Sequence, residues 1–354
     1  MDIVIVHYHA AASVRDAVMA LRLDATSSNI RLNILVADNG STPDERALLQ
    51  SLDIQYLNIG RNAGYAGAAN VAFHATGSDC IVLMNEDVIV LAGCLQELHA
   101  ALMSGASVAG PQFFWDRDSV FLLPCTEERT RRNELLKVGG RRSLRKLERA
   151  RKEWREHARR HWRTGERLRT TALSGALLAF RRDTFRAVGP FDDKFRLYFE
   201  ENDWLLRVAR AGLQSVYVPA AKAIHLHNPT LARSPERQQW EADSFLRFGS
   251  RYYGEHFVRR LLLVCKRATV IPDWQPCVDV IRLDRFEECV WPLWIEMTPS
   301  PSGFPAAATC ITDPKSEWWR LPPMRGLEFL NGTFYLQIVD DVGQELGRYS
   351  YQLT

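Results

Sequence analysis

Apolar and polar residues alternate in two distinct ways through residues 1–110. Short runs rich in Ile, Val and Leu predict buried strands at 3–6, 32–37, 54–57 and 81–84. Longer stretches with apolar residues near helical spacing predict helices at 10–23, 43–52 and 92–104. Because strands that alternate with helices form βαβ units, we expect an α/β fold with a mostly parallel, doubly wound sheet and helices on both faces.

A basic segment interrupts this pattern. From Glu127 to Arg169 the chain carries 17 Lys and Arg against 7 Glu, so this segment holds a charge of +10 and the remainder of the chain holds −7. Within it, 144–162 predicts a helix whose apolar stripe includes Leu147, Trp154 and Ala158. The stripe is equally consistent with a solvated helical hairpin and with a helix that lies on an anionic membrane surface. Nucleic acid is not an expected partner, because no recognisable binding module accompanies the charge.

The α/β pattern resumes after the basic segment and ends near Ala268. A strand is predicted at 171–180, and helices are predicted at 202–211 and 236–253. From 268 onward, Pro, Trp and short alternating runs predict a small antiparallel β-sandwich. We therefore expect an α/β domain over 1–267, with 127–169 as a helical insertion, and a β-rich accessory domain over 268–354.

Composition narrows the class of protein. No apolar run approaches the roughly 18–20 residues of a membrane span. Met1-Asp2-Ile3-Val4 leads directly into a strand pattern without the basic start of a signal peptide. The seven cysteines are odd in number and include no Cys-x-x-Cys pair, which argues against a zinc ribbon and a disulfide scaffold. We therefore expect a protein of the reducing cytosol.

Polar residues stand at the ends of several predicted parallel strands. Asp38-Asn39 follows the second strand, Asn85-Glu86-Asp87 follows the fourth, and the loop with Gly64 and Gly67 opens a helix. This edge of an open α/β sheet binds ligands, and hard carboxylate oxygens suit Mg²⁺ or Mn²⁺. Each motif alone also fits an ordinary acidic turn or helix cap. Their occurrence at one edge is what favours a binding site.

The turn after the first strand argues against two other nucleotide-binding classes. His7-Tyr8-His9-Ala10 stands where a dinucleotide-binding oxidoreductase needs glycines. A nucleotidyltransferase would need a Gly-rich, basic loop at the same place, and this turn is neither.

Taken in order, these residues resemble the family 2 glycosyltransferases of the GT-A fold, most closely the rhamnosyltransferase-like bacterial members, over about residues 1–260. The resemblance implies an enzyme whose strand end at Asp38 binds the nucleotide base and whose Asn62–Asn70 loop lies beside the nucleotide. The implied donor-binding residues are His7, Tyr8, Asp38, Asn39, Asn62, Gly64, Tyr65, Asn70, Asn85 and Glu86.

The resemblance also implies a metal site. Met84-Asn85-Glu86-Asp87 matches the family's Asp-x-Asp position with only the last Asp retained, so Asp87 is the expected ligand of Mg²⁺ or Mn²⁺. His225 resembles the late histidine that completes such a site. His225 and His227 alternate along a predicted strand, so we expect only one of them to face the site and favour His225.

A general base is implied by Phe199-Glu200-Glu201-Asn202-Asp203-Trp204, which resembles the family's Glu-Asp-x-Asp motif. The catalytic candidates are Glu201, Glu200 and Asp203. Because Glu200 and Glu201 begin a predicted helix, its dipole favours their ionised form. Two departures from the family pattern stand out: Glu201 replaces an Asp and reaches one methylene further, and Asn85 replaces an Asp and removes one possible metal ligand.

These expectations combine into an inverting, metal-dependent glycosyltransferase of bacterial surface polysaccharide synthesis, such as that of O-antigen. Its donor would be a nucleotide sugar, with dTDP-rhamnose favoured and UDP- or GDP-sugars left open, and its acceptor a glycan or lipid-linked glycan. We expect a cytoplasmic protein that touches the inner membrane face through 127–169. The alternative is a catalytically weak GT-A protein that binds carbohydrate or assembles with others. Four tryptophans of the accessory domain either stack on sugar rings or fill its core: Trp291, Trp294, Trp318 and Trp319.

Overall fold

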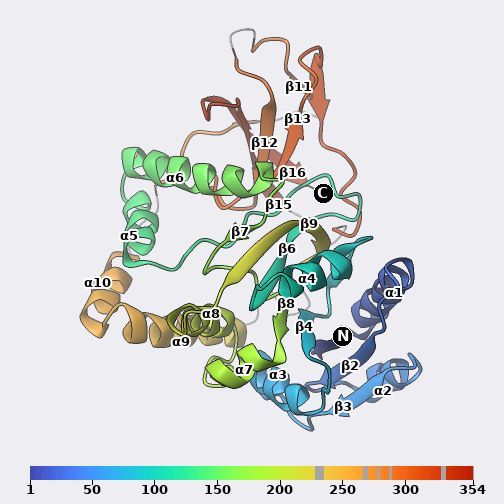
Figure 1. Ribbon diagram of the computed structural model, residues 1–354. Helices are drawn as coiled ribbons and strands as arrows, with labels where there is room; N and C mark the ends of the chain where they lie inside the picture. The colour runs from blue at the N-terminus through green and yellow to red at the C-terminus, as the bar shows by residue number, and fades with distance from the viewer. Residues whose placement is uncertain (228–234, 266–269, 277–279, 287–288, 328–331, 354) are drawn as a thin grey trace. The chain divides into compact units, whose positions relative to one another are not determined.

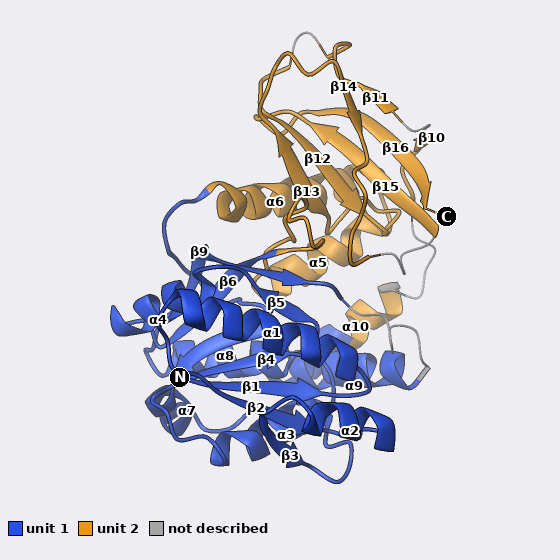
Figure 2. Ribbon diagram, turned by 90° about the vertical axis from the view of Figure 1, so that its right-hand side faces the viewer, with its two compact units in different colours: residues 1–113, 164–258 blue, residues 114–163, 259–354 orange. Residues whose placement is uncertain are grey.

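The computed structural model describes residues 1–227, 235–265, 270–276, 280–286, 289–327 and 332–353. Its contacts divide the chain into two units, coloured in Figure 2. Unit 1 comprises Met1–Phe113 and Thr164–Val258, and unit 2 comprises Phe114–Arg163 and Arg259–Thr354. The predicted division placed 127–169 in the N-terminal domain, whereas the structure groups 114–163 with the C-terminal residues.

Unit 1 is a mixed α/β layer structure, which confirms the predicted fold class (Figure 1). Its strands are β1 (Asp2–His7), β2 (Asn33–Asp38), β3 (Gln55–Asn58), β4 (Cys80–Asn85), β5 (Val88–Val90), β6 (Val108–Phe114), β7 (Leu168–Arg169), β8 (Leu177–Arg181) and β9 (Ser215–His225). Its helices are α1 (Ala11–Ser27), α2 (Pro43–Gln50), α3 (Gly64–His74), α4 (Cys94–Met103), α7 (Arg182–Val188), α8 (Glu200–Arg210) and α9 (Pro235–Tyr252). The helix α10 (Glu255–Cys265) follows across the division between the units.

The central sheet has the strand order β3-β2-β1-β4-β8-β6-β9-β5, and β7 pairs with β9. The strands β3, β2, β1 and β4 are parallel. The β4–β8, β6–β8, β5–β9 and β7–β9 pairs are antiparallel. The prediction of a mostly parallel sheet is therefore wrong for this second half, where β8, the neighbour of β4, runs opposite to it.

The parallel half aligns the strand ends that carry the candidate motifs. His7 is registered with Asp38, and Val6 is registered with Asn85. The ends of β1, β2 and β4 therefore meet at one edge, as the sequence predicts. α3 packs on β1 and β2, so the loop that opens this helix reaches the same edge.

Unit 2 contains α5 (Arg131–Gly140), α6 (Leu144–Arg163) and the strands of the C-terminal region. These strands are β10 (Gln275–Pro276), β11 (Val280–Arg282), β12 (Leu293–Thr298), β13 (Ala307–Ile311), β14 (Trp318–Arg320), β15 (Gly332–Val339) and β16 (Glu345–Leu353). Five of them form a sheet in the order β10-β16-β15-β12-β13, and β11 pairs with β14 separately. The predicted β-sandwich is thus one larger sheet with a small two-stranded companion.

The apolar stripe of α6 packs against this sheet. Trp154 is 1% exposed, and Trp162 stacks on Trp294 with ring centroids 5.5 Å apart. The full cluster comprises Leu147, Ala150, Trp154, Ala158, Trp162, Trp294, Phe304, Ala306 and Ala308. Truncating a buried Trp to Ala typically costs about 3–5 kcal/mol, so this cluster is a principal source of unit 2 stability.

The same packing bears on the two interpretations of the basic helix. The apolar stripe that would enter a lipid interface is buried in protein, so only the exposed basic side chains of α6 can meet a membrane. Of the tryptophans expected either to stack on sugar rings or to fill the core, Trp294 belongs to the core. Trp318 is 59% exposed. Among the described residues, no helix is both long enough and apolar enough to span a membrane.

Candidate active site

Unit 1 contains a cavity of about 570 Å³ at the edge where β1, β2 and β4 end. Its lining combines residues of the strand ends, of the loop before α3, of the start of α8 and of the end of β9. The lining residues are Val6, Tyr8, Ala10, Asn39, Asn62, Tyr65, Asn85, Glu86, Asp87, Ser174, Gly175, Ala176, Arg196, Leu197, Tyr198, Glu200, Glu201, His225, His227, Arg237, Gln238, Trp240 and Glu241. Most of the residues singled out from the sequence therefore meet in one place.

The Asn-x-Gly loop is built around amide side chains. Asn39 Oδ1 accepts a hydrogen bond from the Ala63 amide at 2.8 Å, and Asn62 Oδ1 accepts one from the Gly64 amide at 3.0 Å. Gly64 has φ +73°, and a Cβ there would lie 3.0 Å from the carbonyl oxygen of Arg196. The motif needs glycine at this position because both the backbone angle and the close approach exclude a side chain.

Two of the predicted donor-binding residues, Asp38 and Asn70, are not among the residues that line the cavity. Asp38 is fully buried, and its Oδ1 accepts hydrogen bonds from Ser41 N at 2.8 Å and Ser41 Oγ at 2.7 Å, while the Tyr56 hydroxyl donates to Oδ2. Burial alone would raise the pKa of Asp38, but the hydrogen bonds from Tyr56 and Ser41 hold it below the ordinary value. Asn70 exchanges two hydrogen bonds with the backbone of Phe191, at 2.8 and 3.0 Å. Asp38 and Asn70 therefore shape the site from behind.

His7 also lies outside the cavity lining. It is fully buried, and neither ring nitrogen has a hydrogen-bond partner among the described residues. Burial lowers the pKa of His7, so the ring is neutral at pH 7.

Tyr65 stands at the centre of a group of acidic side chains. Burial raises the pKa of Tyr65 well above its ordinary value, and the charges of Glu200, Glu86, Glu201 and Asp87 raise it further. Burial and the neighbouring Asp87 raise the pKa of Glu86 to about 8. Carboxylates gathered in one buried site disfavour one another's ionised form, so the site is electrostatically prepared for a cation.

Asp87 and His225 are the pair that could hold that cation. Asp87 Oδ1 lies 3.4 Å from His225 Nε2, because Val88 of β5 is registered with His225 of β9. Within the described part of the chain, no group of three or more His, Cys, Asp or Glu side chains is arranged to hold a metal ion. Two protein ligands fit Mg²⁺ or Mn²⁺ in a phosphate site, where the substrate's oxygens and water complete the coordination.

Both histidines of the late motif line the cavity, although strand alternation predicts only one. β9 ends at His225, and His227 has φ +52°, so the side-chain alternation of a strand does not continue to it. The two rings lie with centroids 3.9 Å apart. Burial and the neighbouring His225 lower the pKa of His227 to about 3, so His227 is neutral and its unprotonated ring nitrogen can accept a hydrogen bond or ligate a metal.

Glu200 and Glu201 begin α8 and face the cavity, but their surroundings differ. Glu201 Oε1 accepts a hydrogen bond from the Asn202 side chain at 2.5 Å, and a Cβ at Gly175 would lie 3.0 Å from Glu201 Cγ. Glu200 Oε2 has no hydrogen-bond partner among the described residues. Burial and then Glu201 raise the pKa of Glu200 well above its ordinary value. Burial and the neighbouring Glu201 therefore oppose the effect of the helix dipole on Glu200.

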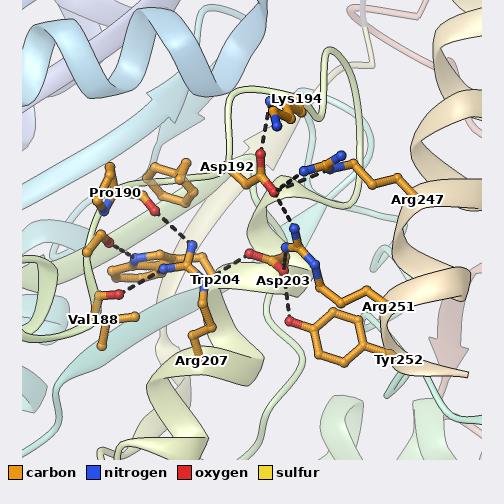
Figure 3. A network of polar contacts seen from close by, with 12 residues as sticks. Val188, Pro190, Asp192, Lys194, Asp203, Trp204, Arg207, Arg247, Arg251 and Tyr252 are labelled. Atoms are coloured by element: carbon orange, nitrogen blue, oxygen red, sulfur yellow. Dashed lines mark hydrogen bonds and ion pairs between the residues drawn. The ribbon is translucent and has the colours of Figure 1, made fainter.

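Asp203, the third catalytic candidate, does not line the cavity. It is fully buried in the network of Figure 3, where its carboxylate accepts hydrogen bonds from Arg207 at 2.9 Å, Arg251 at 2.5 Å and the Tyr252 hydroxyl at 2.7 Å. Arg251 and Arg247 both donate in turn to Asp192. Asp203 therefore ties α8 to α9 and positions the start of α8.

Several residues that line the cavity were not predicted from the sequence. Arg196 lies with its guanidinium 5.0 Å from the Trp240 ring centre, and Arg237 donates a hydrogen bond to the Tyr198 hydroxyl. These arginines are the positive charges of the lining. The position of Arg196 just before the Glu200–Trp204 motif was the available clue.

The family described as "Glycosyl transferase family 2" matches residues 2–169 of this chain, which confirms the resemblance over the motifs at Asp38, Asn62–Asn70 and Asn85–Asp87. An N-acetylglucosaminyl-diphospho-decaprenol L-rhamnosyltransferase of Mycobacterium tuberculosis is 28% identical over 219 residues, which cover 58% of this chain and 69% of that relative.

Two solved structures were also compared. A mannosyltransferase from Pyrobaculum calidifontis, in complex with GDP-Man and Mn²⁺, has a TM-score of 0.42 at 13% identity and covers 77% of this chain and 76% of its own. A glucosyl-3-phosphoglycerate synthase from Mycobacterium tuberculosis, with Mn²⁺ and UDP, has a TM-score of 0.43 at 16% identity and covers 80% and 84%.

Proposed function

We propose that this chain is a glycosyltransferase of family 2, whose model matches residues 2–169, and that it is an inverting enzyme that depends on a divalent cation. Its donor is a nucleotide diphosphate sugar. The observation that carries the proposal is that one cavity brings the Asp87–His225 pair together with the Glu200–Glu201 pair.

Asp87 and His225 would hold Mg²⁺ or Mn²⁺ between them. When bound, the ion would stabilise the negative charge of the leaving diphosphate as a Lewis acid. Asn39, Asn62 and Tyr8 would face the nucleotide, since they line the part of the cavity nearest β1 and β2. Arg196 and Arg237 supply the positive charges that suit the diphosphate.

Glu201 is the proposed general base. It would accept the proton of the acceptor hydroxyl while the acceptor oxygen bonds to the anomeric carbon and the bond to the diphosphate breaks. Gly175 leaves the space into which Glu201 packs, and Asn202 orients its carboxylate. Burial raises the pKa of Glu200, which favours its neutral form and limits the negative charge beside the base.

The donor sugar and the acceptor follow from the mycobacterial relative. That protein is named for transfer of L-rhamnose to N-acetylglucosaminyl-diphospho-decaprenol. By analogy, rhamnose from dTDP-rhamnose, passed to a lipid-linked glycan in bacterial surface polysaccharide synthesis, is the reaction that we propose. The exposed basic residues of α6 would then draw the protein electrostatically to the inner face of the membrane, which pelleting with anionic vesicles at low and high salt measures.

The test uses purified protein, dTDP-L-rhamnose and release of dTDP with Mn²⁺ or EDTA. Asp87→Asn and Glu201→Gln should each reduce turnover by about 100-fold or more, because one removes a metal ligand and the other the base. Calorimetry of Mn²⁺ binding in the presence of dTDP separates the two roles: Asp87→Asn should lose this binding and Glu201→Gln should keep it. Asp44→Asn, at an exposed carboxylate of α2, is the matched control. Wild-type turnover in both variants would refute the proposal.

A further inference from the structure

A second cavity, of about 290 Å³, lies within unit 2 between the C-terminal half of α6 and the turn that joins β15 to β16. Its lining carries five cationic side chains against two carboxylates. The lining residues are Lys152, Arg155, Glu156, Arg159, Arg160, Arg163, Asp341, Val342 and Gly343. The excess of positive charge is unusual for a pocket in which two of the arginines are buried.

Arg155 is the member of this set whose charge the fold already balances. Its Nε and Nη2 donate to the two carboxylate oxygens of Glu296 at 2.6 and 2.8 Å, and Nη2 also reaches Gln337 Oε1 at 3.3 Å. This is the side-on, two-point geometry by which a guanidinium recognises an oxyanion. Arg155 therefore forms a structural wall of the cavity.

Arg159 lies one helical turn further along α6 and presents the same edge without a partner. It is 6% exposed, and its Nη1 donates to the Asp341 carbonyl at 3.0 Å. Its Nε and Nη2 have no hydrogen-bond partner among the described residues. Burial lowers the pKa of Arg159 to about 10, so the group stays charged at pH 7. Buried charged donors left without an acceptor are costly, which points to an acceptor that comes from outside the chain.

Three further cations line the same cavity as Arg159. Arg163 forms an ion pair with Asp341 and lies 5.6 Å from the Trp294 ring centre, so its position is fixed. Lys152 and Arg160 are exposed at the rim, and in the described part of the chain no ion pair joins either of them to a carboxylate. Lys152 and Arg160 at the rim and Arg159 at the floor therefore place positive charge around the same cavity.

We propose that this cavity binds a phosphate group, either a phosphomonoester or a diphosphate. Arg159, whose charge no carboxylate of the described residues pairs with, supplies positive charge at the floor, and Lys152 and Arg160 neutralise the phosphate from the rim. A multiply charged tetrahedral oxyanion matches three available cations better than a single carboxylate does. The volume is at the lower end of that of small-molecule sites, which suits a phosphorylated sugar or a phospholipid headgroup. The site is separate in composition from the unit 1 cavity and rests on none of its residues.

The binding test uses the full chain, EDTA, low salt and pyrophosphate as the probe, measured by titration calorimetry. Arg159→Gln and the double variant Lys152→Gln/Arg160→Gln should each weaken pyrophosphate binding by about tenfold or more, because each removes charge-assisted hydrogen bonds. Arg145→Gln, exposed on α6 outside the cavity, should leave the affinity unchanged. If Arg159→Gln lowers the melting temperature and cannot be read, the exposed double variant decides. No binding by the wild type, or equal affinities in all variants, overturns the proposal.

A vesicle arm identifies the source of the phosphate. The site is assigned to a lipid headgroup if the protein pellets with phosphatidic acid vesicles but not with phosphatidylcholine vesicles. This pelleting must also be lost in Lys152→Gln/Arg160→Gln and be displaced by pyrophosphate. Pyrophosphate binding without such pelleting assigns it to a soluble phosphorylated ligand. Pelleting that the double variant retains, together with no binding of pyrophosphate, contradicts a phosphate site in this cavity.

Discussion

The cavities of the two units are lined by opposite charges but are constructed alike. In unit 1, α8 presents two buried carboxylates: Asp203 accepts three hydrogen bonds from protein donors, whereas Glu200 Oε2 has none among the described residues. In unit 2, α6 presents two buried guanidinium groups: Arg155 is paired with Glu296, whereas Arg159 leaves Nε and Nη2 without acceptors.

The comparison separates two uses of a buried charge on one helix. The side chain whose polar atoms are paired within the protein holds an element in place, and the side chain a turn away that keeps polar atoms without partners lines the cavity. Burial alone therefore does not identify a functional residue. The hydrogen-bond partners of each buried charge distinguish a structural side chain from a functional one. Mutation of the two kinds is therefore expected to change the free energy of unfolding by different amounts.

The largest expected effect is at Arg155. Arg155→Met leaves Glu296 buried without its partner and should lower the free energy of unfolding by about 3–5 kcal/mol in urea titrations. The double variant Arg155→Met/Glu296→Leu should recover most of that loss, since it removes both charges. Arg149→Met is the control, because Arg149 is 69% exposed and its pair with Glu153 contributes less than about 0.5 kcal/mol. Equal losses of unfolding free energy in Arg155→Met and Arg149→Met would contradict the structural role assigned to the buried Arg155.

A smaller effect distinguishes the two carboxylates of α8. Asp203→Asn removes the charge that accepts from Arg207, Arg251 and Tyr252, and should lower the free energy of unfolding by about 2–3 kcal/mol. Glu200→Gln should change it by less than about 0.5 kcal/mol, because no protein donor is lost. Both are measured by chemical denaturation of the metal-free protein. A greater loss for Glu200→Gln than for Asp203→Asn would contradict the assignment of roles.

The smallest effect is a pH dependence at Asp192. Burial would raise its pKa, but hydrogen bonds from Arg247 and Arg251 hold it at about 2, below the ordinary 3.8. Since the folded value is the lower one, this stabilisation is complete above about pH 4 and is lost as the pH falls toward 2. Asp192→Asn should therefore cost about 1–2 kcal/mol at pH 7, and the difference from wild type should narrow at pH 2.

The matched control for this pH dependence is Asp183→Asn, at a side chain that is 78% exposed. Its unfolding free energy should follow that of the wild type at every pH. A difference between wild type and Asp192→Asn that stays constant from pH 7 to pH 2 would count against the pairing of Asp192 with the two arginines.

Much of the fold could be predicted because local patterns determine local elements. The strands β1, β2 and β4 and the helix α6 lie close to their predicted ranges. The direction of β8 and the partner of α6 could not be predicted, since both depend on contacts between residues far apart in the sequence. An amphipathic stripe shows that a helix buries one face, but the stripe is the same whether a membrane or a β-sheet covers it.

The site was predictable to the level of motifs and less so to the level of side chains. Asp38, Asp87 and Asp203 all stand in matched motifs, yet only Asp87 lines the cavity. Asp38 instead accepts hydrogen bonds within a turn that includes Ser41, and Asp203 accepts hydrogen bonds in the network of Arg251 and Tyr252. His227 was excluded by strand alternation because a positive φ leaves no mark in the sequence.

Unit 2 is assembled from two stretches that the ribosome delivers at different times. α6 is synthesised about 130 residues before β12. At a translation rate of roughly 5–20 residues per second, its tryptophans therefore lack their partners Trp294 and Phe304 for on the order of ten seconds. Until then, an apolar stripe edged by arginines is open to other nascent chains and to chaperones. A chain released before β12 would keep that helix exposed permanently, so truncation near the C-terminal end is expected to cause aggregation as well as loss of a domain.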